Sequence, residues 1–452
     1  MKNILAKELI DSVINNNYCS GCGICTATEN SPFRMKLNKN GAFVPVAKNE
    51  NLQENIVCPF AEHQVDFVEL SNRLFEDENT SINKEFGNYI NIYAGYVKEN
   101  DYRKNGSSGG SVTWFANQLL QEKMVDYIVA VQENSNQEIR FNYQIYHLPE
   151  NNKKASKSKY YPTHLEEVLK FIKENNGRYA IIGLPCFIKG INLLKIKEKI
   201  YAERIKYTVS LFCGHLKTTH YLSLLASQFD LNEKQIKHFD FRHKVSGKKA
   251  FDYATKIIDT NNKIHIKQNK ELFGTDWGLG LFKLKACDYC DDIIGETADI
   301  SFGDAWIHKY EDDFMGNNIV VTRKKELDEL IQKNIDNRKL QYEPLTPQDL
   351  IDSQAGGFRH RREGLAYRLY LKHRKNIWTP PSRVQPEKIS NKKRRKLYKL
   401  RMIIQEKSYH TKNYRNATQL KKELKKYIQG IDKIYQPSTW VRFRNHLKNL
   451  FK

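Results

Sequence analysis

Three closely spaced cysteines near the N-terminus constrain this chain more than any other feature. They lie in the run Cys19-Ser20-Gly21-Cys22-Gly23-Ile24-Cys25, a C-x2-C-x2-C pattern on a glycine-rich turn. Glycines let the backbone turn sharply, so the three thiolates can face one centre. This spacing is typical of cubane iron–sulfur clusters, whereas zinc sites usually pair two separate C-x2-C turns. It predicts a 4Fe-4S cluster, with a zinc knuckle or a redox-sensing thiol group as the alternatives.

The fourth ligand of this cluster is not at the usual place. In ferredoxin-type runs a Cys-Pro pair follows soon after the third cysteine, but residues 26–32 contain no cysteine. The next Cys-Pro pair is Cys58-Pro59, which follows two short strand-like runs at Phe33–Leu37 and Ala42–Val46. We therefore expect a loop to deliver Cys58 as the fourth ligand.

The other four cysteines form a second candidate set. Cys186 and Cys213 end or follow apolar runs at 178–186 and 206–215, which are typical of parallel strands in an α/β sheet. Ligands of such sheets bind outside the carboxyl ends of the strands. Cys287 and Cys290 form a C-x2-C pair before another strand-like run, 298–302. Together they predict a second four-thiolate site. The alternatives are strand-end packing residues and a redox-active or zinc-binding C-x2-C pair.

Length and composition place the chain among cytoplasmic proteins of several domains. Its 452 residues include no apolar run near the ~20 residues that a membrane helix needs. The N-terminus has no signal-peptide core, so we expect a cytoplasmic protein whose eight cysteines are reduced thiols rather than disulfides.

A glycine- and serine-rich loop marks a candidate anion site. Its residues are Gly106, Ser107, Ser108, Gly109, Gly110 and Ser111, and a helical pattern of apolar residues follows. Free backbone N–H groups at the start of a helix favour a pyrophosphate or another anion. The alternative is a helix cap without a ligand.

The order of these motifs resembles one known family. C-S-G-C-G-I-C, G-S-S-G-G-S-V-T, G-L-P-C, F-C-G-H and C-D-Y-C followed by A-D-I-S-F-G-D-A-W occur in turn between residues 19 and 306. This order is similar to that of the beta-subunit family of coenzyme F-420 hydrogenases and dehydrogenases, over roughly residues 15 to 360. The resemblance implies an iron–sulfur flavoprotein with two 4Fe-4S clusters and FAD. It also implies a ferredoxin or deazaflavin electron donor and a small organic substrate. Relatives include the 7-hydroxymethyl chlorophyll a reductase, and similar bacterial proteins occur in exopolysaccharide or glycan contexts.

The resemblance also implies roles for particular residues. Cys19, Cys22, Cys25 and Cys58 match one cluster site, and Cys186, Cys213, Cys287 and Cys290 match the other. The Gly106–Ser111 loop matches the flavin-contacting segment. Arg242, Lys244 and Lys248 match a basic stretch that faces an anionic cofactor or substrate, with a solvated hairpin as the alternative. Asp304 and Trp306 match a turn beside a cluster, and His215 or a nearby lysine is a candidate general acid.

The expected fold is α/β in four parts. These are an iron–sulfur segment of ferredoxin type (1–85), two domains of the family's N-terminal and C-terminal types (86–165 and 166–380), and a basic helical tail (381–452). The expected function is an oxidoreductase that passes electrons through the clusters and FAD to a substrate. A non-catalytic electron-transfer subunit and a zinc-stabilised binding protein are the alternatives.

The tail carries most of the positive charge. Residues 381–452 contain 21 Lys or Arg and 4 Asp or Glu, a net charge of +17, whereas the whole chain carries +22. Residues 438–452 predict a helix with an apolar face flanked by basic residues, a pattern that fits contact with an anionic membrane surface on its inner side. The alternatives are a partner-binding helix and a helix docked on the body. Nucleic-acid binding is disfavoured, because no recognition fold accompanies the charge.

Overall fold

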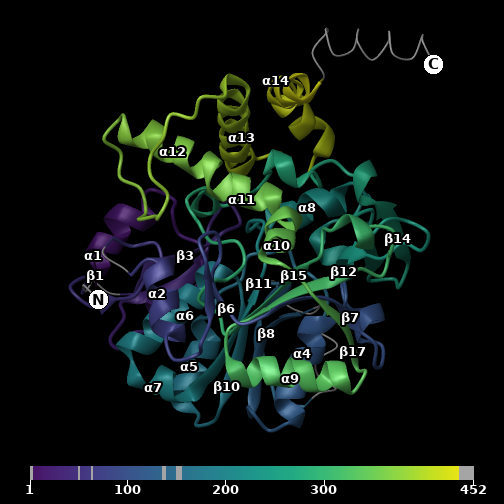
Figure 1. Ribbon diagram of the computed structural model, residues 1–452. Helices are drawn as coiled ribbons and strands as arrows, with labels where there is room; N and C mark the ends of the chain where they lie inside the picture. The colour runs from purple at the N-terminus through teal and green to yellow at the C-terminus, as the bar shows by residue number, and fades with distance from the viewer. Residues whose placement is uncertain (1–3, 49–50, 63–64, 135–138, 149–154, 437–452) are drawn as a thin grey trace.

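The apolar runs before Cys186 and Cys213 form the middle of the central sheet. The computed structural model describes residues 4–48, 51–62, 65–134, 139–148 and 155–436. Its main sheet has eight strands in the order β17-β7-β16-β15-β11-β10-β8-β9 (Figure 1). The strands are β7 (Ile92–Val97), β8 (Tyr127–Glu133), β9 (Phe141–Tyr146), β10 (Tyr179–Gly183), β11 (Ile205–Leu211), β15 (Ile300–Asp304), β16 (Asn318–Thr322) and β17 (Leu340–Pro344).

The sheet is parallel in its middle and antiparallel toward both edges. Strands β8, β10, β11 and β15 run parallel, as predicted for the two apolar runs. Strands β9, β16, β7 and β17 each pair antiparallel with a neighbour. This confirms the α/β class and adds antiparallel edges, which the sequence pattern did not predict.

Both faces of the sheet are covered, which explains the continuous apolar runs. Along β10, Tyr179 and Ile181 lie in one core while Ala180 and Ile182 lie in the other. The first core includes side chains of α5 (Glu166–Glu174) and α6 (Pro185–Lys197). The second includes side chains of α4 (Ser111–Gln121) and α9 (Lys325–Asp336).

The N-terminal region packs against the first core. Strand β1 (Ile4–Leu5) pairs with β4 (Asn55–Ile56), and β2 (Phe33–Leu37) forms the expected hairpin with β3 (Phe43–Ala47). The other elements here are α1 (Ala6–Leu9), the π-helical turn η1 (Ile10–Ile14), the 3-10 turn η2 (Ile24–Thr26), α2 (Phe67–Phe75), β5 (Ser81–Asn83) and β6 (Gly87–Tyr89). Helix α6 passes close to η2, because a Cβ at Gly190 would lie 2.7 Å from Cγ1 of Ile24.

A third core joins a small sheet to the tail. Strands β12 (Ile236–His243), β13 (Ala254–Asp259) and β14 (Ile264–Gln268) form an antiparallel sheet beside α8 (His220–Ser227). Helices α13 (Lys392–His410) and α14 (Ala417–Tyr435) contribute Leu397, Ile404, Leu420 and Leu424 to the same core. The helical tail is therefore confirmed as far as residue 436 and packs on the body.

The remaining helices and turns connect these layers. They are α3 (Tyr102–Asn105), α7 (Lys199–Arg204), η4 (Glu233–Gln235), η5 (Asn269–Glu271), η6 (Trp277–Leu279), η7 (Lys285–Asp288), η8 (His308–Tyr310), α10 (Pro347–Ser353), α11 (Ala355–Arg361) and α12 (Glu363–His373). None of the helices in the described ranges combines the length and apolar character needed to span a bilayer. The apolar-faced helix predicted at 438–452 lies outside the described residues.

Candidate redox site

The first group of cysteines lines one small pocket. Cys19, Cys22, Cys25 and Cys58 surround it together with apolar side chains of the N-terminal region. Gly21 and Gly23 have φ of +76° and +83°, a conformation that L side chains rarely adopt, so the glycines permit this turn. Burial raises the pKa of the Cys25 thiol well above its usual value, and the thiols of Cys22, Cys19 and Cys58 raise it further. The structure thus brings the predicted first set together.

The second group of cysteines converges from three separate segments. Burial raises the pKa of the Cys186 thiol well above its usual value, and Cys290, Cys213 and Cys287 raise it further. Cys213 follows β11, while Cys287 lies in η7 and Cys290 just beyond it. Cys186 was expected at the end of a strand, but β10 ends at Gly183 and Cys186 lies in the first turn of α6. Proline at position 185 favours a helix start there.

Neither group has the geometry of a single-metal site. In the described ranges no three His, Cys, Asp or Glu side chains stand close enough to share one metal ion. Zn–S bonds of about 2.3 Å would hold four thiolates within about 4 Å of one another. A cubane cluster binds its four thiolates to four different irons and does not impose that condition.

The two thiol groups lie near each other across helix α6. Cys22 of the first group raises the pKa of the Cys186 thiol. Cys22 and Cys186 both raise the pKa of the buried Tyr143 hydroxyl. Lys189, on the same helix as Cys186, is 5% exposed. Burial lowers the pKa of Lys189, while Asp291, Cys290, Asp66 and Cys58 act in the opposite direction. A buried lysine therefore lies close to cysteines of both groups.

A second buried cation, Arg361, lies beside the second thiol group. Arg361 of α11 donates to the carbonyls of Asp292, Cys213 and Gly214 at 2.8 to 3.0 Å. Its guanidinium lowers the pKa of the Cys213, Cys287 and Cys290 thiols, although burial raises each of them more. Sequence reasoning missed Lys189 and Arg361, because neither belongs to a local motif.

The glycine- and serine-rich loop forms the start of α4. Gly110 has φ of +85°, and a Cβ there would lie 2.5 Å from the carbonyl carbon of Tyr102. The Ser111 N–H donates to Asn318 Oδ1 at 3.3 Å. The Ser107 hydroxyl accepts from the Ser158 N–H at 2.8 Å. The loop is thus tightly folded by partners from β16 and from residues 155–160.

Basic side chains gather beside this loop. Lys244 donates to the Ser108 carbonyl at 2.8 Å and to the Arg103 carbonyl. Burial, together with the nearby Lys157, Arg103 and Arg242, lowers the pKa of Lys244 to about 7. Arg103, Lys157 and Arg242 each pair with an aspartate, whereas Lys244 bonds backbone carbonyls, so Lys244 adds a positive charge that favours an anion beside the loop.

The predicted basic stretch separates into three different environments. Arg242 is buried in β12 and forms a 2.6 Å ion pair with Asp304, so the solvated-hairpin alternative does not apply to it. Lys244 contacts the loop, whereas Lys248 is exposed. Trp306, 37% exposed, lies 5.6 Å from the Arg242 guanidinium. Arg242, Asp304 and Trp306 therefore belong to one cluster.

His215 lies in an aromatic pocket next to the second thiol group. Its ring is 4.2 Å from that of Trp277, and its Nε2 is buried without a hydrogen-bond partner. Burial lowers the pKa of His215 well below its usual value. Lys217 lies over the Trp277 ring at 4.5 Å, and Tyr160 packs against the same ring. Sequence reasoning singled out neither Trp277 nor Tyr160.

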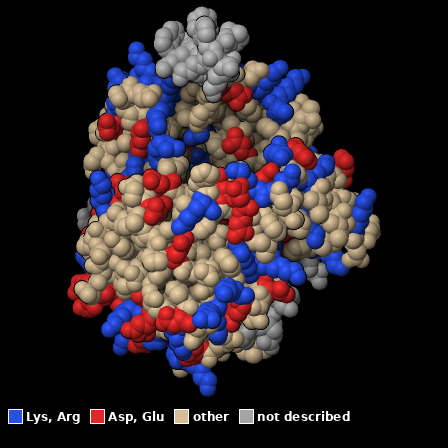
Figure 2. Space-filling view, turned by 45° about the vertical axis from the view of Figure 1, so that its right-hand side comes forward, with Lys and Arg blue, Asp and Glu red and all other residues tan. Residues whose placement is uncertain are grey.

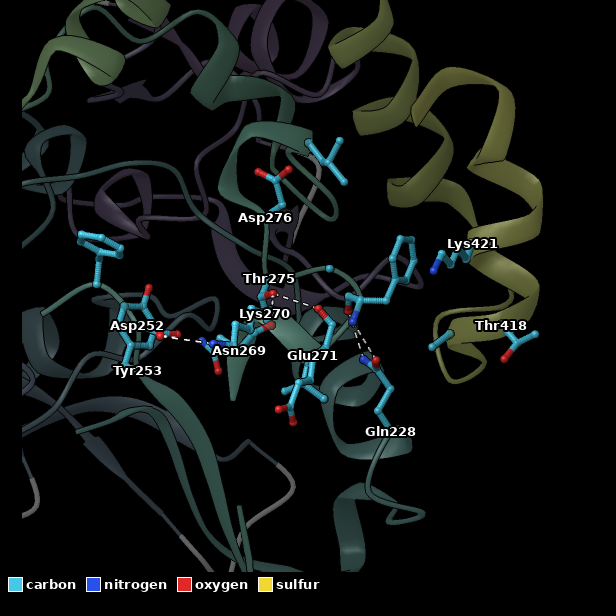
Figure 3. Close-up of a pocket in the computed structure, with 16 residues that line it drawn as sticks. Gln228, Asp252, Tyr253, Asn269, Lys270, Glu271, Thr275, Asp276, Thr418 and Lys421 are labelled. Atoms are coloured by element: carbon cyan, nitrogen blue, oxygen red, sulfur yellow. Dashed lines mark hydrogen bonds and ion pairs between the residues drawn. The ribbon is translucent and has the colours of Figure 1, made fainter. Parts of the chain in front are cut away.

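A larger pocket opens near this aromatic group, with Asp276, the neighbour of Trp277 in sequence, in its lining. Its volume is about 820 Å³, and it lies between the β13–η6 region and the first turns of α14 (Figure 3). It contains none of the predicted cysteines or loop residues. Tyr253 lines the pocket and packs on the Arg242 guanidinium at 4.8 Å, while Asp276 precedes Trp277. The pocket therefore adjoins the Arg242–Asp304 pair.

Comparison with known proteins identifies the family. The profile of the coenzyme F-420 hydrogenase/dehydrogenase beta subunit N-terminus matches residues 92–170, and the profile of its C-terminus matches residues 176–348. Together they cover more than half of the chain. The chain belongs to the coenzyme F-420 hydrogenase/dehydrogenase beta-subunit family. The predicted resemblance is thereby confirmed.

Individual relatives of this F-420 beta-subunit family member are distant. An uncharacterised protein of Methanocaldococcus jannaschii is 24% identical over 51% of this chain and 78% of its own length. The coenzyme F-420-dependent sulfite reductase of the same organism is 22% identical, over 44% of this chain and 31% of its own length. A chain of the F-420-reducing NiFe hydrogenase complex from Methanosarcina barkeri aligns over 64% of this chain and 96% of its own. That alignment has 16% sequence identity and a TM-score of 0.49.

The family points to an F-420-linked oxidoreductase or electron-transfer subunit. The matched region contains the Gly106–Ser111 loop, the second thiol group and the Arg242–Asp304 pair. The first thiol group and the tail helices lie outside it. Their roles must be argued from their own contacts.

Proposed function

We propose that this protein is an iron–sulfur flavin oxidoreductase with two 4Fe-4S clusters and one FAD. Cys19, Cys22, Cys25 and Cys58 hold the first cluster, and Cys186, Cys213, Cys287 and Cys290 hold the second. The observation that carries the proposal is that all eight cysteines of the chain gather into two groups of four. The groups are buried and adjacent, as electron transfer between clusters requires.

The chain's own residues support a flavin beside the second group. The Gly106–Ser111 loop lies at the start of α4, and Lys244 adds a positive charge beside it, a combination that would suit a pyrophosphate. When bound, FAD supplies the exchange between single electrons and electron pairs. The Arg242–Asp304 pair lies at the end of β15, between this loop and the 820 Å³ pocket.

The pocket favours a substrate-binding enzyme over a pure relay subunit. Its walls combine aromatic, amide and charged side chains, including Tyr253, Asn269 and Asp276, which suits a polar organic molecule (Figure 3). A glycan precursor stays a prediction as the substrate, and a ferredoxin or a deazaflavin as the donor. His215 stays a candidate for handling a proton, and Asp276 and Lys270 line the pocket itself.

Anaerobic purification with iron, sulfide and flavin analysis tests this function. We expect about eight iron, about eight sulfide and one FAD per chain, with both chromophores reduced by dithionite. Zinc without flavin would overturn the oxidoreductase assignment. Full reduction with product formed only when another protein is added would instead support the relay subunit.

A further inference from the structure

One surface turn combines apolar and basic side chains and packs on Tyr18, which precedes Cys19 of the first thiol group. It is the segment 372–378, at the end of α12, and it lies beyond the region that the family profiles match. Ile377 is 38% exposed, and Trp378 is partly exposed. Lys372, His373, Arg374 and Lys375 precede them, and all but Lys372 are exposed. An apolar centre with a polar rim is the usual composition of a protein interface.

One buried residue, Tyr18, connects the turn to the first thiol group. The Trp378 ring packs edge-on against Tyr18, with 5.7 Å between the ring centroids, and the Tyr18 hydroxyl donates to the Trp378 carbonyl at 3.4 Å. Tyr18 is fully buried and immediately precedes Cys19. Cys19 is the one cysteine of the first group that is partly exposed. The turn therefore packs on a buried residue that directly precedes a cysteine of the first group.

The charge around this turn is predominantly positive. Lys285 lies over the Tyr18 ring at 4.4 Å and donates to the Asn16 carbonyl at 2.7 Å. Lys372 and Lys285 interact electrostatically, which places these two cations near each other. Glu406 interacts electrostatically with Lys285. Glu62 accepts a hydrogen bond from the Trp378 indole N–H at 3.3 Å. Asp288 also interacts with Lys285, so four cations, Lys285, Lys372, Arg374 and Lys375, stand against three carboxylates.

We propose that the 372–378 turn, with Lys285, is the docking surface for an acidic protein that carries single electrons. The carrier places its redox centre over Trp378 and Tyr18 and gives one electron to the cluster of the first thiol group. The carrier is oxidised and the cluster is reduced, with no bond made or broken. Basic rim residues attract an acidic partner and align it, which raises the association rate. This inference rests on the proposed function.

The tail helices explain why the carrier docks here and not on the tail itself. Exposed lysines of α13 and α14 lie at the end of the molecule seen at the top of Figures 1 and 2. The tail's contact with the first thiol group is made by Tyr409, whose ring is buried beside Asn38. Positive charge on the tail therefore strengthens the field that draws in an acidic carrier, while Trp378 of the turn offers an apolar contact on Tyr18, the residue before Cys19.

The test compares two variants with the same change in charge. Lys372→Glu with Lys375→Glu alters the proposed surface, and Lys425→Glu with Lys426→Glu alters exposed lysines of α14. The probe is a reduced acidic bacterial-type ferredoxin, and stopped-flow absorbance at low salt follows reduction of the full-length holoprotein. We expect the first variant to be reduced at least tenfold more slowly and the second to lose less than threefold.

The other outcomes separate this inference from the proposed function. Equal losses in both variants, or none in either, would overturn the docking surface. Loss of binding to anionic phosphatidylserine vesicles in the first variant, with ferredoxin reduction unchanged, would make the turn a lipid contact instead. Reduction by dithionite bypasses docking and should be unchanged in every variant. If dithionite reduces no cluster in the parent protein, the proposed function fails and not only its docking surface.

Discussion

Buried charges beside the thiols are the residue-scale feature that distinguishes the two groups. Lys189 lies close to cysteines of both thiol groups, while Arg361 lowers the pKa of three thiols of the second group. A fixed positive charge near an iron–sulfur cluster stabilises the added electron, so it raises the reduction potential. With the proposed clusters bound, the second would be the better acceptor, so electrons would pass from the first thiol group toward the Gly106–Ser111 loop.

Replacing Lys189 tests whether a buried positive charge raises the cluster reduction potentials. Lys189→Met keeps the length of the side chain but removes the charge, so both cluster potentials should become more negative. A tenfold change in the one-electron equilibrium corresponds to about 59 mV, and we expect a shift of that order. Redox titration followed by electron paramagnetic resonance measures it. Lys195→Met, on the same helix but beside Asp299, is the matched control and should leave both potentials unchanged.

Lys244 gives a second residue-scale prediction, in the pH dependence of flavin binding. Its pKa is lowered to about 7 in the free protein, and a bound pyrophosphate favours the protonated lysine. Above pH 7, FAD binding therefore requires Lys244 to take up a proton. Affinity should be fully present below pH 7 and fall about tenfold between pH 6 and pH 8. Fluorescence titration of the apoprotein with FAD measures this, and Lys244→Gln should bind weakly at every pH. The same slope in that variant would rule Lys244 out as its source.

Helix α6 is the element that joins the two thiol groups. It begins with Pro185 and Cys186, carries Lys189 one turn later, and packs through Gly190 onto Ile24 of η2. The first group was predictable from sequence, because three of its cysteines and both glycines are local. The apolar runs likewise predicted β10 and β11. The start of α6, the antiparallel edges and the partners Lys189 and Arg361 depend on contacts between distant segments, which no local pattern encodes.

The contact at Gly190 gives a prediction for this element. Gly190→Ala places a Cβ 2.7 Å from the Ile24 side chain, so overpacking should cost about 1–3 kcal/mol. Because η2 carries Cys25, iron bound at the first group should fall more than iron at the second. Thermal unfolding and iron analysis measure the two effects. Gly356→Ala in α11 meets nothing within 4 Å and serves as the control, which should keep full stability and iron content.

At the scale of the whole molecule, the tail is part of the body's packing. Helix α13 holds the segment that leads to the second thiol group, because Gln405 donates to the Lys283 carbonyl at 2.7 Å and the Ser408 hydroxyl accepts from the Phe282 N–H at 2.9 Å. A basic tail alone predicted a surface role. Its buried face, which Leu420 and Leu424 contribute to the third core, became visible only with the fold.

Truncating a tail side chain should therefore destabilise the body as well. Leu424→Ala removes a fully buried side chain of α14 and should cost about 2–5 kcal/mol. Circular dichroism and tryptophan fluorescence should then show one transition at a lower temperature. A body transition at the parent's temperature, preceded by separate melting of helix, would show that the tail is an independent unit.

The most direct test of the central claim is the iron content of two cysteine variants, Cys22→Ser and Cys287→Ser. Each removes a ligand from one thiol group, so each folded variant should retain about four of about eight irons and lose one of two cluster signals in electron paramagnetic resonance. The signal lost should differ between the variants. Unchanged iron in both, or loss of the same signal in both, would contradict two separate four-cysteine sites.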